Sequence, residues 1–436
     1  MSDEIKSIAV VGGGTMGSGI ASLAATAGCE VLLIDVDRLA AERGLAQALA
    51  GAPSPEETAL LRGRIAIGTI AEDLPRIAAA DWICEAIVED LAAKRALFVA
   101  VEAARRPGSV VSTNTSGIRL REIVGGLPIR LRQEIVVTHF FNPVRVMRLM
   151  EIVPGAETRP DVVATLAAFG RDKLGKGVVR AKDTVNFIGN RIGCFFMLAG
   201  LHKAKPYLAQ GLTQETIDAL LGAPVGLPST GLYGLIDLIG LDVMGLVGRN
   251  LAANLPAGDI GREFARLPET ERAMRERGQL GRKSGGGFYR VSKGPDGAKL
   301  KEVFDLGLGD WRPAATVALA DTWKDAQSLL FAEDAAGRFV WEALGGTLLY
   351  AADLVPEIAD DIVNVDRAMR WGFAWRQGPF ELIDELGPER LTARLAREGK
   401  PLPRLLATLA AAGAKRFYRD GEFLGVDGGY HPIPAE

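Results

Sequence analysis

The sequence predicts an α/β domain with a doubly wound, mostly parallel sheet, followed by two all-α domains related by an internal repeat. Strand-like and helix-like runs alternate through the first half, the second half consists of long apolar periodic segments, and two short pieces of that half recur. The boundaries that we draw are 1–183, 184–293 and 310–420. A chain of 436 residues is expected to hold two or three domains.

The predicted strands of the first half are short and nearly all apolar. Parallel sheets are covered by helices on both faces, so their strands lack the alternation of half-exposed strands. Helical patterns at 16–27, 91–104 and 160–173 accompany them, a rhythm typical of a doubly wound sheet. The strands are "SIAVVG" (7–12), "EVLLID" (30–35), "DWICEAI" (81–87), "SVVSTN" (109–114) and "IVVTH" (135–139).

The second half repeats itself. "GLYGLIDLIGLD" (231–242) is echoed by "GPFELIDELG" (378–387), and "TIDALLG" (216–222) by "NVDRAMRWG" (364–372). Asp237 thereby pairs with Asp384 and Asp218 with Asp366, at offsets of 147 and 148, and such similar offsets favour a duplicated domain. The segments with helical periodicity are 186–208, 213–222, 235–254, 335–353 and 360–370.

The stretch between the two copies, "VSKGPDGAKLK" (291–301), is rich in Gly, Lys and Pro. This composition predicts a linker.

Composition narrows the function classes. A net charge of −3 gives no support for a nucleic-acid partner or an anionic membrane surface. Cys29, Cys84 and Cys194 lack CxxC spacing, so we expect buried free thiols in a reducing compartment and no metal site. The start of the chain does not resemble a signal peptide, and the longest apolar run (192–201) is about half of a membrane span. We therefore expect a cytoplasmic protein without a membrane span.

"VVGGGTMGSG" (10–19) holds three glycines in GxGxxG spacing, between a predicted strand and a predicted helix. In this context Gly12 allows the tight turn, Gly14 lets the backbone approach a pyrophosphate, and Gly17 lets the helix pack on the strand. Thr15 and Met16, at the helix N-terminus, offer free N–H groups to the phosphates. The motif predicts a Rossmann-like dinucleotide site.

Asp35 ends the next predicted strand, 18 residues after Gly17. A carboxylate here accepts hydrogen bonds from ribose hydroxyls and repels a 2′-phosphate, so the expected cofactor is NAD rather than NADP.

Other polar residues end strands at the same predicted edge, where ligands of open α/β sheets bind. They are Glu89, the segment 114–116 and His139, the last residue of "IVVTH". A histidine beside apolar residues is more often a packed core residue, but its place on the cofactor edge favours catalysis. His202 and His431 have no such setting.

Several motifs resemble the L-3-hydroxyacyl-CoA dehydrogenase family of fatty-acid β-oxidation. They come in the family's order from residue 7 to about 290, and the later repeat is similar to the bacterial fusions in which an enoyl-CoA hydratase domain follows. The motifs are "VVGGGTMGSGIA", "EAIVEDLAAK", "STNTSGI", "HFFNPVRVMRLMEIV", "NFIGNR" and "GRKSGGGFY".

This resemblance implies roles for individual residues. His139 matches the catalytic histidine and Glu151 its glutamate partner, while Ser116 and Asn190 match residues that hold the substrate's 3-hydroxyl region. The alternatives are that Glu151 is an exposed strand charge, Ser116 a turn residue and Asn190 a helix cap. The positions that match NAD contacts are Glu89, Lys94, Ser116, Asn142 and Lys283.

The sequence departs from the family in two places. Val185 and Asn186 replace the usual Pro-Gly pair before the "FIGNR" helix, which affects how Asn190 is presented. The region 38–68 is shorter and poorer in lysine than in many relatives. We therefore carry no CoA ligand over from it, and we read Arg64 and Arg121 as solvated charges rather than CoA contacts.

The resemblance implies NAD-dependent oxidation of an L-3-hydroxyacyl-CoA by a cytoplasmic enzyme. It also implies a hydratase domain or partner, and either a monomer with an internal pseudo-dimer or a homodimer. Two other readings stay open: a dehydrogenase of a free hydroxy acid or sugar acid, and a non-catalytic NAD-binding protein. The sequence contains no hydratase motif, so we expect no hydration of enoyl-CoA by this chain.

Overall fold

The computed structural model describes residues 5–293 and 299–436 and divides into two compact units. Unit 1 comprises residues 1–188, 357–360 and 435–436, and unit 2 comprises residues 189–356 and 361–434. Unit 1 contains the predicted α/β domain, and unit 2 contains the helices of both predicted copies. The boundaries 1–183, 184–293 and 310–420 stay a prediction.

Unit 1 is built on an eight-stranded sheet with the order β3-β2-β1-β4-β5-β6-β7-β8. The pairs from β3 to β6 are parallel, β7 runs antiparallel to β6, and β8 runs parallel to β7. The prediction of a doubly wound, mostly parallel sheet is confirmed. The strands are β1 (Ser7–Val11), β2 (Glu30–Asp35), β3 (Ile65–Thr69), β4 (Trp82–Glu85), β5 (Val110–Thr113), β6 (Ile135–Phe140), β7 (Leu149–Pro154) and β8 (Gly177–Arg180).

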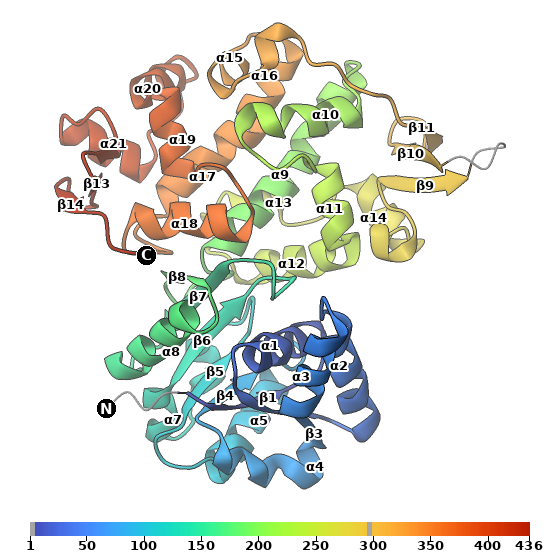
Figure 1. The fold of residues 1–436 in the computed structure, drawn as a ribbon. Coiled ribbons are helices and arrows are strands. Elements are labelled where there is room, and N and C mark those ends of the chain that lie inside the picture. Colours follow the sequence, from blue (N-terminus) through green and yellow to red (C-terminus); the bar gives the residue numbers. More distant parts are fainter. Residues whose placement is uncertain (1–4, 294–298) are drawn as a thin grey trace. The chain divides into compact units, whose positions relative to one another are not determined.

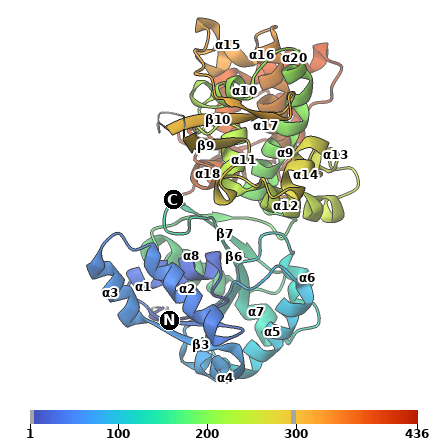
Figure 2. The same cartoon turned by 90° about the vertical axis from the view of Figure 1, so that its right-hand side faces the viewer.

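Helices cover both faces of this sheet, with α1, α2 and α8 on one side and α5, α6 and α7 on the other (Figure 2). This explains why all residues of β4 and β6 are buried. Asp37 and Asp90 each cap a helix, accepting hydrogen bonds from the backbone N–H of Ala40 and Ala93. The helices are α1 (Thr15–Thr26), α2 (Arg38–Ala50), α3 (Pro55–Arg64), α4 (Ile70–Asp73), α5 (Leu91–Ala104), α6 (Leu120–Val124), α7 (Ile129–Glu134) and α8 (Pro160–Asp172).

Unit 2 is mainly helical, and its long helix α9 carries two glycines that allow close packing (Figure 1). A Cβ on Gly193 would lie 2.1 Å from the ring of Phe373, and one on Gly200 would lie 3.0 Å from Leu232. α9 thus contacts both copies. The helices are α9 (Gly189–Ala209), α10 (Gln214–Leu220), α11 (Tyr233–Ile239), α12 (Leu241–Asn254), α13 (Gly261–Phe264), α14 (Glu269–Glu276), α15 (Ala326–Leu330), α16 (Ala335–Val340), α17 (Gly346–Leu354), α18 (Ile362–Gly372), α19 (Pro379–Leu386), α20 (Pro388–Arg397) and α21 (Arg404–Ala411).

Two small antiparallel sheets accompany these helices, which the prediction of purely helical domains did not include. β9 and β10 occupy the two ends of the predicted linker 291–301, so that prediction is wrong for its described residues; 294–298 lie outside them. The strands are β9 (Tyr289–Lys293), β10 (Lys299–Asp305), β11 (Asp310–Pro313), β12 (Tyr418–Arg419), β13 (Glu422–Leu424) and β14 (Tyr430–Pro432).

The internal repeat is visible in the hydrogen bonds of its aspartates. Asp218 accepts from the backbone N–H of Tyr233 at 2.7 Å and from the hydroxyl of Tyr289 at 2.8 Å. Asp366 accepts in the same way from the N–H of Phe380 at 2.8 Å and from the hydroxyl of Tyr418 at 2.7 Å.

In each copy, a second aspartate accepts a hydrogen bond from the backbone N–H of the tyrosine whose hydroxyl binds the first aspartate. Asp237 accepts from the N–H of Tyr289 at 2.7 Å, and Asp384 from the N–H of Tyr418 at 2.8 Å. Each copy therefore ties two helices to one strand through two buried or half-buried carboxylates. The sequence repeat reflects this shared network.

The three cysteines are free and buried, as expected. None of the described helices is long and apolar enough to cross a membrane.

Candidate active site

The glycine turn between β1 and α1 has the geometry that its sequence predicts. Gly12 has φ +104°, and a Cβ there would lie 2.5 Å from the carbonyl oxygen of Ala86. A Cβ on Gly17 would lie 1.8 Å from the carbonyl oxygen of Gly12. Both positions therefore require glycine.

Gly14 differs from these two, because a Cβ there would meet nothing within 4 Å. Gly14 is also the N-cap residue of α1, and the helix start has no side-chain cap. Open space above uncapped backbone N–H groups is what a pyrophosphate requires. The turn therefore fits the phosphates of a dinucleotide.

Asp35 closes β2 next to this turn. Its carboxylate accepts hydrogen bonds from the N–H groups of Gly13 and Val36, both at 2.6 Å. The side chain is only partly buried, and it stands where an acidic residue contacts the ribose of NAD.

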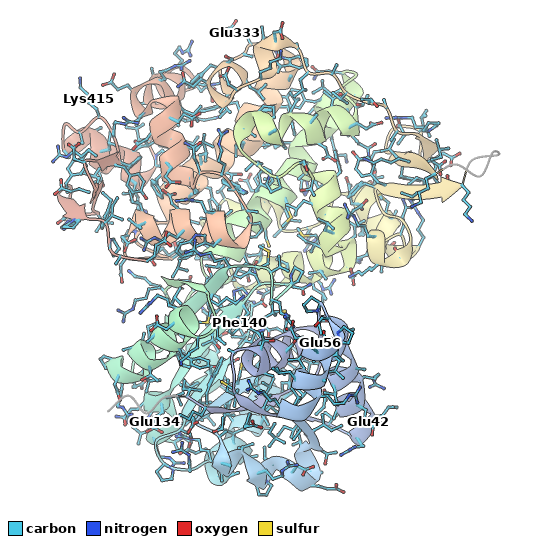
Figure 3. All side chains as sticks on the ribbon, viewed as in Figure 1. Glu42, Glu56, Glu134, Phe140, Glu333 and Lys415 are labelled. Atoms are coloured by element: carbon cyan, nitrogen blue, oxygen red, sulfur yellow. The ribbon has the colours of Figure 1, made fainter. Side chains whose placement is uncertain are left out.

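A hydrogen bond joins the ends of β5 and β6 at the same edge of the sheet. The amide oxygen of the buried Asn114 accepts from the N–H of Phe140 at 3.0 Å. Phe140 (labelled in Figure 3) is the last residue of β6 and follows His139. This bond fixes the strand end on which the histidine stands.

His139 and Glu151 lie opposite each other on the antiparallel strands β6 and β7. The imidazole Nδ1 is 2.6 Å from Oε2 of the carboxylate. His139 is 3% exposed and Glu151 is fully buried. Because Nδ1 is engaged, Nε2 is the ring nitrogen left for a ligand, and it makes no hydrogen bond within the described part of the chain.

The segment before α9 completes the surroundings of this pair within unit 1. The N–H of Ile188 donates to Oε1 of Glu151 at 3.0 Å, and the ring of Phe187 lies 5.6 Å from the imidazole. The ring of Phe141 also packs against the imidazole, with 4.6 Å between the ring centres. Apolar rings therefore screen the histidine from water.

Asn186 and Phe187 have φ values of +62° and +51°. Asn186 occupies the place of the glycine in the family's Pro-Gly pair, and Asn is among the residues that enter the left-handed region most easily. The residue differs from the family's glycine, yet its backbone adopts the positive φ that glycine favours. A phenylalanine in this region is unusual, and the neighbouring contacts must hold it there.

Glu89 and Lys94 belong to one charge network at this edge of the sheet, in which Lys94 is buried and Glu89 is exposed. The ammonium of Lys94 is 1% exposed and lies 2.7 Å from the buried Glu85 and 3.3 Å from Glu89. Glu89 also accepts from the hydroxyl of Thr115 and from the N–H of Ser116. Burial opposes ionisation of Glu89, but Lys94 and these hydrogen bonds outweigh it and hold its pKa below the usual range.

Thr15 and Met16 are the first two residues of α1, after the glycine turn. Two more predicted site residues of unit 1, Ser116 and Asn142, are exposed. Ser116 follows the end of β5 and Asn142 follows the end of β6, so both lie at the carboxyl edge of the sheet. The structure thus brings them to the same edge as Gly14 and His139.

Asn190 and Lys283 belong to unit 2, and their predicted contacts with substrate and with NAD stay predictions. Asn190 is the second residue of α9, and Lys283 forms an ion pair of 2.6 Å with Asp242. Arg64 donates to the carbonyl of Ala25, and Arg121 lies beside Asp183.

Lys176 is a residue that sequence reasoning missed. It is 6% exposed, and its ammonium donates to the carbonyls of Val144 and Met147, in the loop after Asn142. Burial lowers its pKa to about 8. The only sequence signal was a lysine between two glycines, which reads as a surface turn.

The fold and this edge define a dinucleotide-binding α/β protein with a buried histidine–glutamate pair. Residues 7–184 match the family model described as 3-hydroxyacyl-CoA dehydrogenase, NAD binding domain, and residues 187–291 match the C-terminal domain of the same family. A probable 3-hydroxyacyl-CoA dehydrogenase of Deinococcus radiodurans is 35% identical over 66% of this chain and 84% of its own length. The chain belongs to the 3-hydroxyacyl-CoA dehydrogenase family, and NAD is confirmed as its cofactor.

Two further comparisons extend over nearly the whole chain. A probable 3-hydroxyacyl-CoA dehydrogenase of Bacillus subtilis is 35% identical over 96% of this chain but only 56% of its own length, so the chain spans about half of that relative. The crystal structure of 3-hydroxybutyryl-CoA dehydrogenase from Escherichia coli K12 has a TM-score of 0.69, with 24% identity over 94% of this chain and 98% of that one. The latter likeness concerns the fold, including the second helical copy.

Proposed function

We propose that this chain oxidises L-3-hydroxyacyl-CoA to 3-ketoacyl-CoA with NAD, as a step of fatty-acid β-oxidation. The observation that carries the proposal is the 2.6 Å contact between Nδ1 of His139 and Oε2 of Glu151. It leaves Nε2 as the free base, at the same sheet edge as the glycine turn of the cofactor domain.

Oxidation of a secondary alcohol requires that a proton leave the oxygen while a hydride leaves the carbon. NAD supplies the hydride acceptor when bound. Nε2 of His139 takes the hydroxyl proton, and the imidazolium that forms lies against the Glu151 carboxylate. Glu151 also fixes the tautomer, because Nδ1–H donates to it and Nε2 stays unprotonated before the reaction. In the reverse direction the imidazolium returns the proton.

Other residues orient the reactants in this proposal. Ser116 and Asn190 hold the substrate hydroxyl, so that the alcohol carbon faces the nicotinamide. Gly12, Gly14 and Gly17, with Thr15 and Met16, hold the pyrophosphate. Asp35 holds the adenosine ribose, and Glu89, Lys94, Asn142 and Lys283 complete the cofactor site. The burial of Lys94 favours a role for it in placing Glu89 rather than in touching NAD.

The test is NADH formation with L-3-hydroxyacyl-CoAs of increasing chain length, alongside the corresponding free hydroxy acids. We expect turnover of the thioesters and inhibition by free CoA. Turnover of a free hydroxy acid that CoA does not inhibit would favour the related-dehydrogenase reading. Tight NADH binding without any turnover would favour a non-catalytic NAD-binding protein.

We propose further that the second helical copy acts as an internal partner of the first, which makes the chain a monomer. Supporting contacts lie within unit 2: Phe195 stacks on Tyr350 at 4.1 Å, and the buried Arg191 donates to the Tyr350 hydroxyl at 2.6 Å. Light scattering should give a mass near 46.4 kDa. About twice that mass would contradict this proposal.

A hydratase function is proposed for a fused domain or a partner, not for this chain. The chain spans 56% of its Bacillus subtilis relative, which leaves room for a further domain there. Hydration of enoyl-CoA by the purified chain would refute this assignment.

A further inference from the structure

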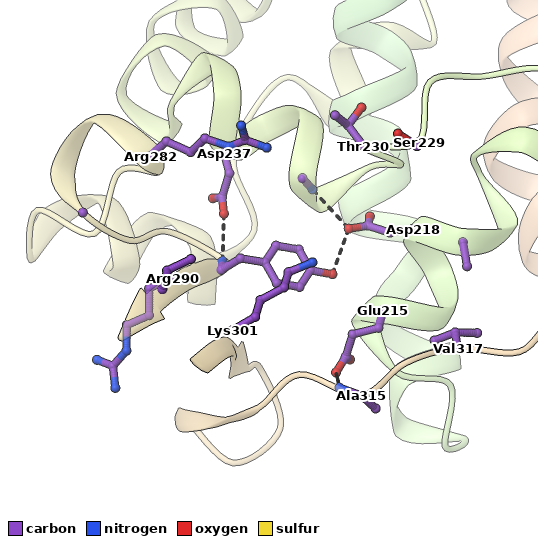
Figure 4. A pocket seen from close by; sticks show the side chains of 15 residues that line it. Glu215, Asp218, Ser229, Thr230, Asp237, Arg282, Arg290, Lys301, Ala315 and Val317 are labelled. Carbon is purple, nitrogen blue, oxygen red and sulfur yellow. Dashed lines mark hydrogen bonds between the residues drawn. The ribbon is translucent and has the colours of Figure 1, made fainter. Parts of the chain in front are cut away.

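A cavity of about 710 Å³ lies in unit 2, between α10, the start of α11 and the β9–β10 hairpin (Figure 4). Its walls come from the first helical copy, from β9 and β10, and from Ala315 and Val317 in the segment after β11. The volume lies in the range of small-molecule sites. The residues that line it belong to unit 2.

Two cationic side chains that line this cavity are accessible to a ligand. Arg282 and Lys301 are exposed, and neither forms an ion pair within the described ranges 5–293 and 299–436. The ammonium of Lys301 lies 4.5 Å from the centre of the Tyr289 ring, which places it over the cavity wall. Arg290 differs, because it is paired with Glu302 at 2.7 Å.

The three carboxyl groups of the cavity, on Glu215, Asp218 and Asp237, are each engaged by other groups of the protein. Glu215 is paired with Arg312 at 2.7 Å. Burial raises the pKa of Asp218 to about 7, so this carboxyl is about half protonated at neutral pH. Burial raises the pKa of Asp237 only to about 6, so Asp237 is mostly ionised there, and its charge is partly offset by the nearby Arg282. Their oxygens are occupied by backbone N–H groups and, for Asp218, by the hydroxyl of Tyr289.

Two hydroxyl residues line the cavity wall, and of these Ser229 is the exposed one. The Thr230 Oγ1 atom is buried and has no hydrogen-bond partner in the described part of the chain. In Figure 4 these two side chains come from the segment before α11. Arg282 comes from the turn before β9, and Lys301 comes from β10.

The second copy of the repeat shows that the fold does not need Lys301, whereas Arg416 lies near Asp384 there as Arg282 lies near Asp237 in the first copy. Asp366 and Tyr418 reproduce the Asp218–Tyr289 contact. In the first copy, however, the hairpin extends past Tyr289, and Lys301 pairs with Val291. In the second copy β12 ends one residue after Tyr418, and Arg419 pairs directly with Glu422 at the turn. The longer hairpin that carries Lys301 is thus peculiar to the first copy.

We propose that this cavity binds the phosphate groups of a small soluble molecule. The Arg282 guanidinium offers paired donors to phosphate oxygens, Lys301 adds a point charge, and the exposed Ser229 hydroxyl donates a further hydrogen bond. Occupancy of this cavity requires no turnover of the dehydrogenase.

The experiment is isothermal titration calorimetry of the full chain with inorganic pyrophosphate, in saturating NADH so that the phosphate site of unit 1 is filled. Adenosine 3′,5′-bisphosphate in a second series distinguishes a nucleotide ligand from a simple diphosphate. The variant is Arg282→Gln/Lys301→Gln. The matched control is Lys415→Gln/Arg416→Gln, which removes the same two charges from exposed positions of the second copy (Lys415 is labelled in Figure 3).

We expect saturable binding of at least one of the two probes. The dissociation constant should rise at least about tenfold in the Arg282→Gln/Lys301→Gln variant and stay within about twofold in the control. NADH binding should be unchanged in both, which shows that the variants are folded. Absence of saturable binding to the wild type, or equal affinity in the cavity variant, would overturn the proposal.

Discussion

The imidazole of His139 and the carboxylate of Glu151 meet directly across an antiparallel strand pair, with 2.6 Å between Nδ1 and Oε2. Strand pairing sets this contact, since the two residues are register partners and neither depends on a loop for its position. Both are buried, and the backbone N–H of Ile188 binds the other carboxylate oxygen. The pair is therefore rigid before any substrate arrives.

The first prediction concerns the carboxylate of this pair. In Glu151→Gln, the side chain keeps an oxygen for the Ile188 N–H, so the fold should persist. The variant loses the negative charge that stabilises the imidazolium and fixes its tautomer. We expect kcat to fall at least about tenfold with an unchanged dissociation constant for NADH. Equal kcat in steady-state assays would show that the carboxylate is not part of the mechanism.

The glycine turn offers a matched pair of substitutions. Gly14→Ala places a methyl group in open space, so the thermal midpoint should stay within about 2 °C of the wild type. That methyl group faces the predicted pyrophosphate position, and NADH affinity should fall at least about tenfold. Gly17→Ala, whose Cβ would lie 1.8 Å from a carbonyl oxygen, should lower the thermal midpoint itself. Full NADH affinity in Gly14→Ala would contradict this assignment.

The cofactor edge could be predicted from the sequence because its signals are local. The strand "VLLID" and the glycines of "GGGTMG" act through their own backbone geometry, and the five predicted strands lie within a few residues of β1, β2, β4, β5 and β6. The outer strands β3 and β8 were not predicted. β7 was not predicted, because "LMEIVP" has a charged residue in its middle. That residue is Glu151, and it is buried only because His139 stands opposite.

The remaining features depend on contacts between distant parts of the chain. Lys94 is a charged residue on a helix, and only the neighbouring Glu85 explains its burial. Similarly, "VSKGPDGAKLK" has the composition of a linker, yet its ends pair as β9 and β10 because Tyr289 is held by two aspartates. Composition does not report such tertiary contacts.

The third prediction concerns the left-handed backbone of Asn186. Glycine adopts φ +62° without steric cost, whereas alanine pays roughly 1 kcal/mol. Both substitutions remove the same buried side chain, so we expect the free energy of unfolding of Asn186→Ala to be about 1 kcal/mol below that of Asn186→Gly. Urea unfolding of the two variants measures this difference. Greater stability of the alanine variant than of the glycine variant would contradict the described backbone.

The fourth prediction concerns the buried Glu271 on α14. Burial raises its pKa from 4.5 to about 7, so the folded state holds a proton that the unfolded state releases. The resulting contribution to stability is complete below pH 4.5 and is lost as the pH rises through about 7. This shift corresponds to roughly 3 kcal/mol.

Glu271→Gln removes this titration, and the exposed Glu269→Gln on the same helix is the control. Between pH 4.5 and 8, the wild type should lose up to about 3 kcal/mol of unfolding free energy relative to Glu271→Gln, but not relative to Glu269→Gln. Parallel stability profiles for the wild type and Glu271→Gln would refute this account of the carboxyl.

The central claim is that His139 is the base of an NAD-dependent hydroxyacyl-CoA oxidation. The most direct measurement is kcat for NADH formation from an L-3-hydroxyacyl-CoA by His139→Ala, with His202→Ala as the control; His202 lies on α9 in unit 2 and bonds to the carbonyl of Arg266. We predict that His139→Ala loses at least about 10²-fold in kcat while it still binds NADH, and that His202→Ala keeps its activity. Near-normal turnover by His139→Ala would contradict the account.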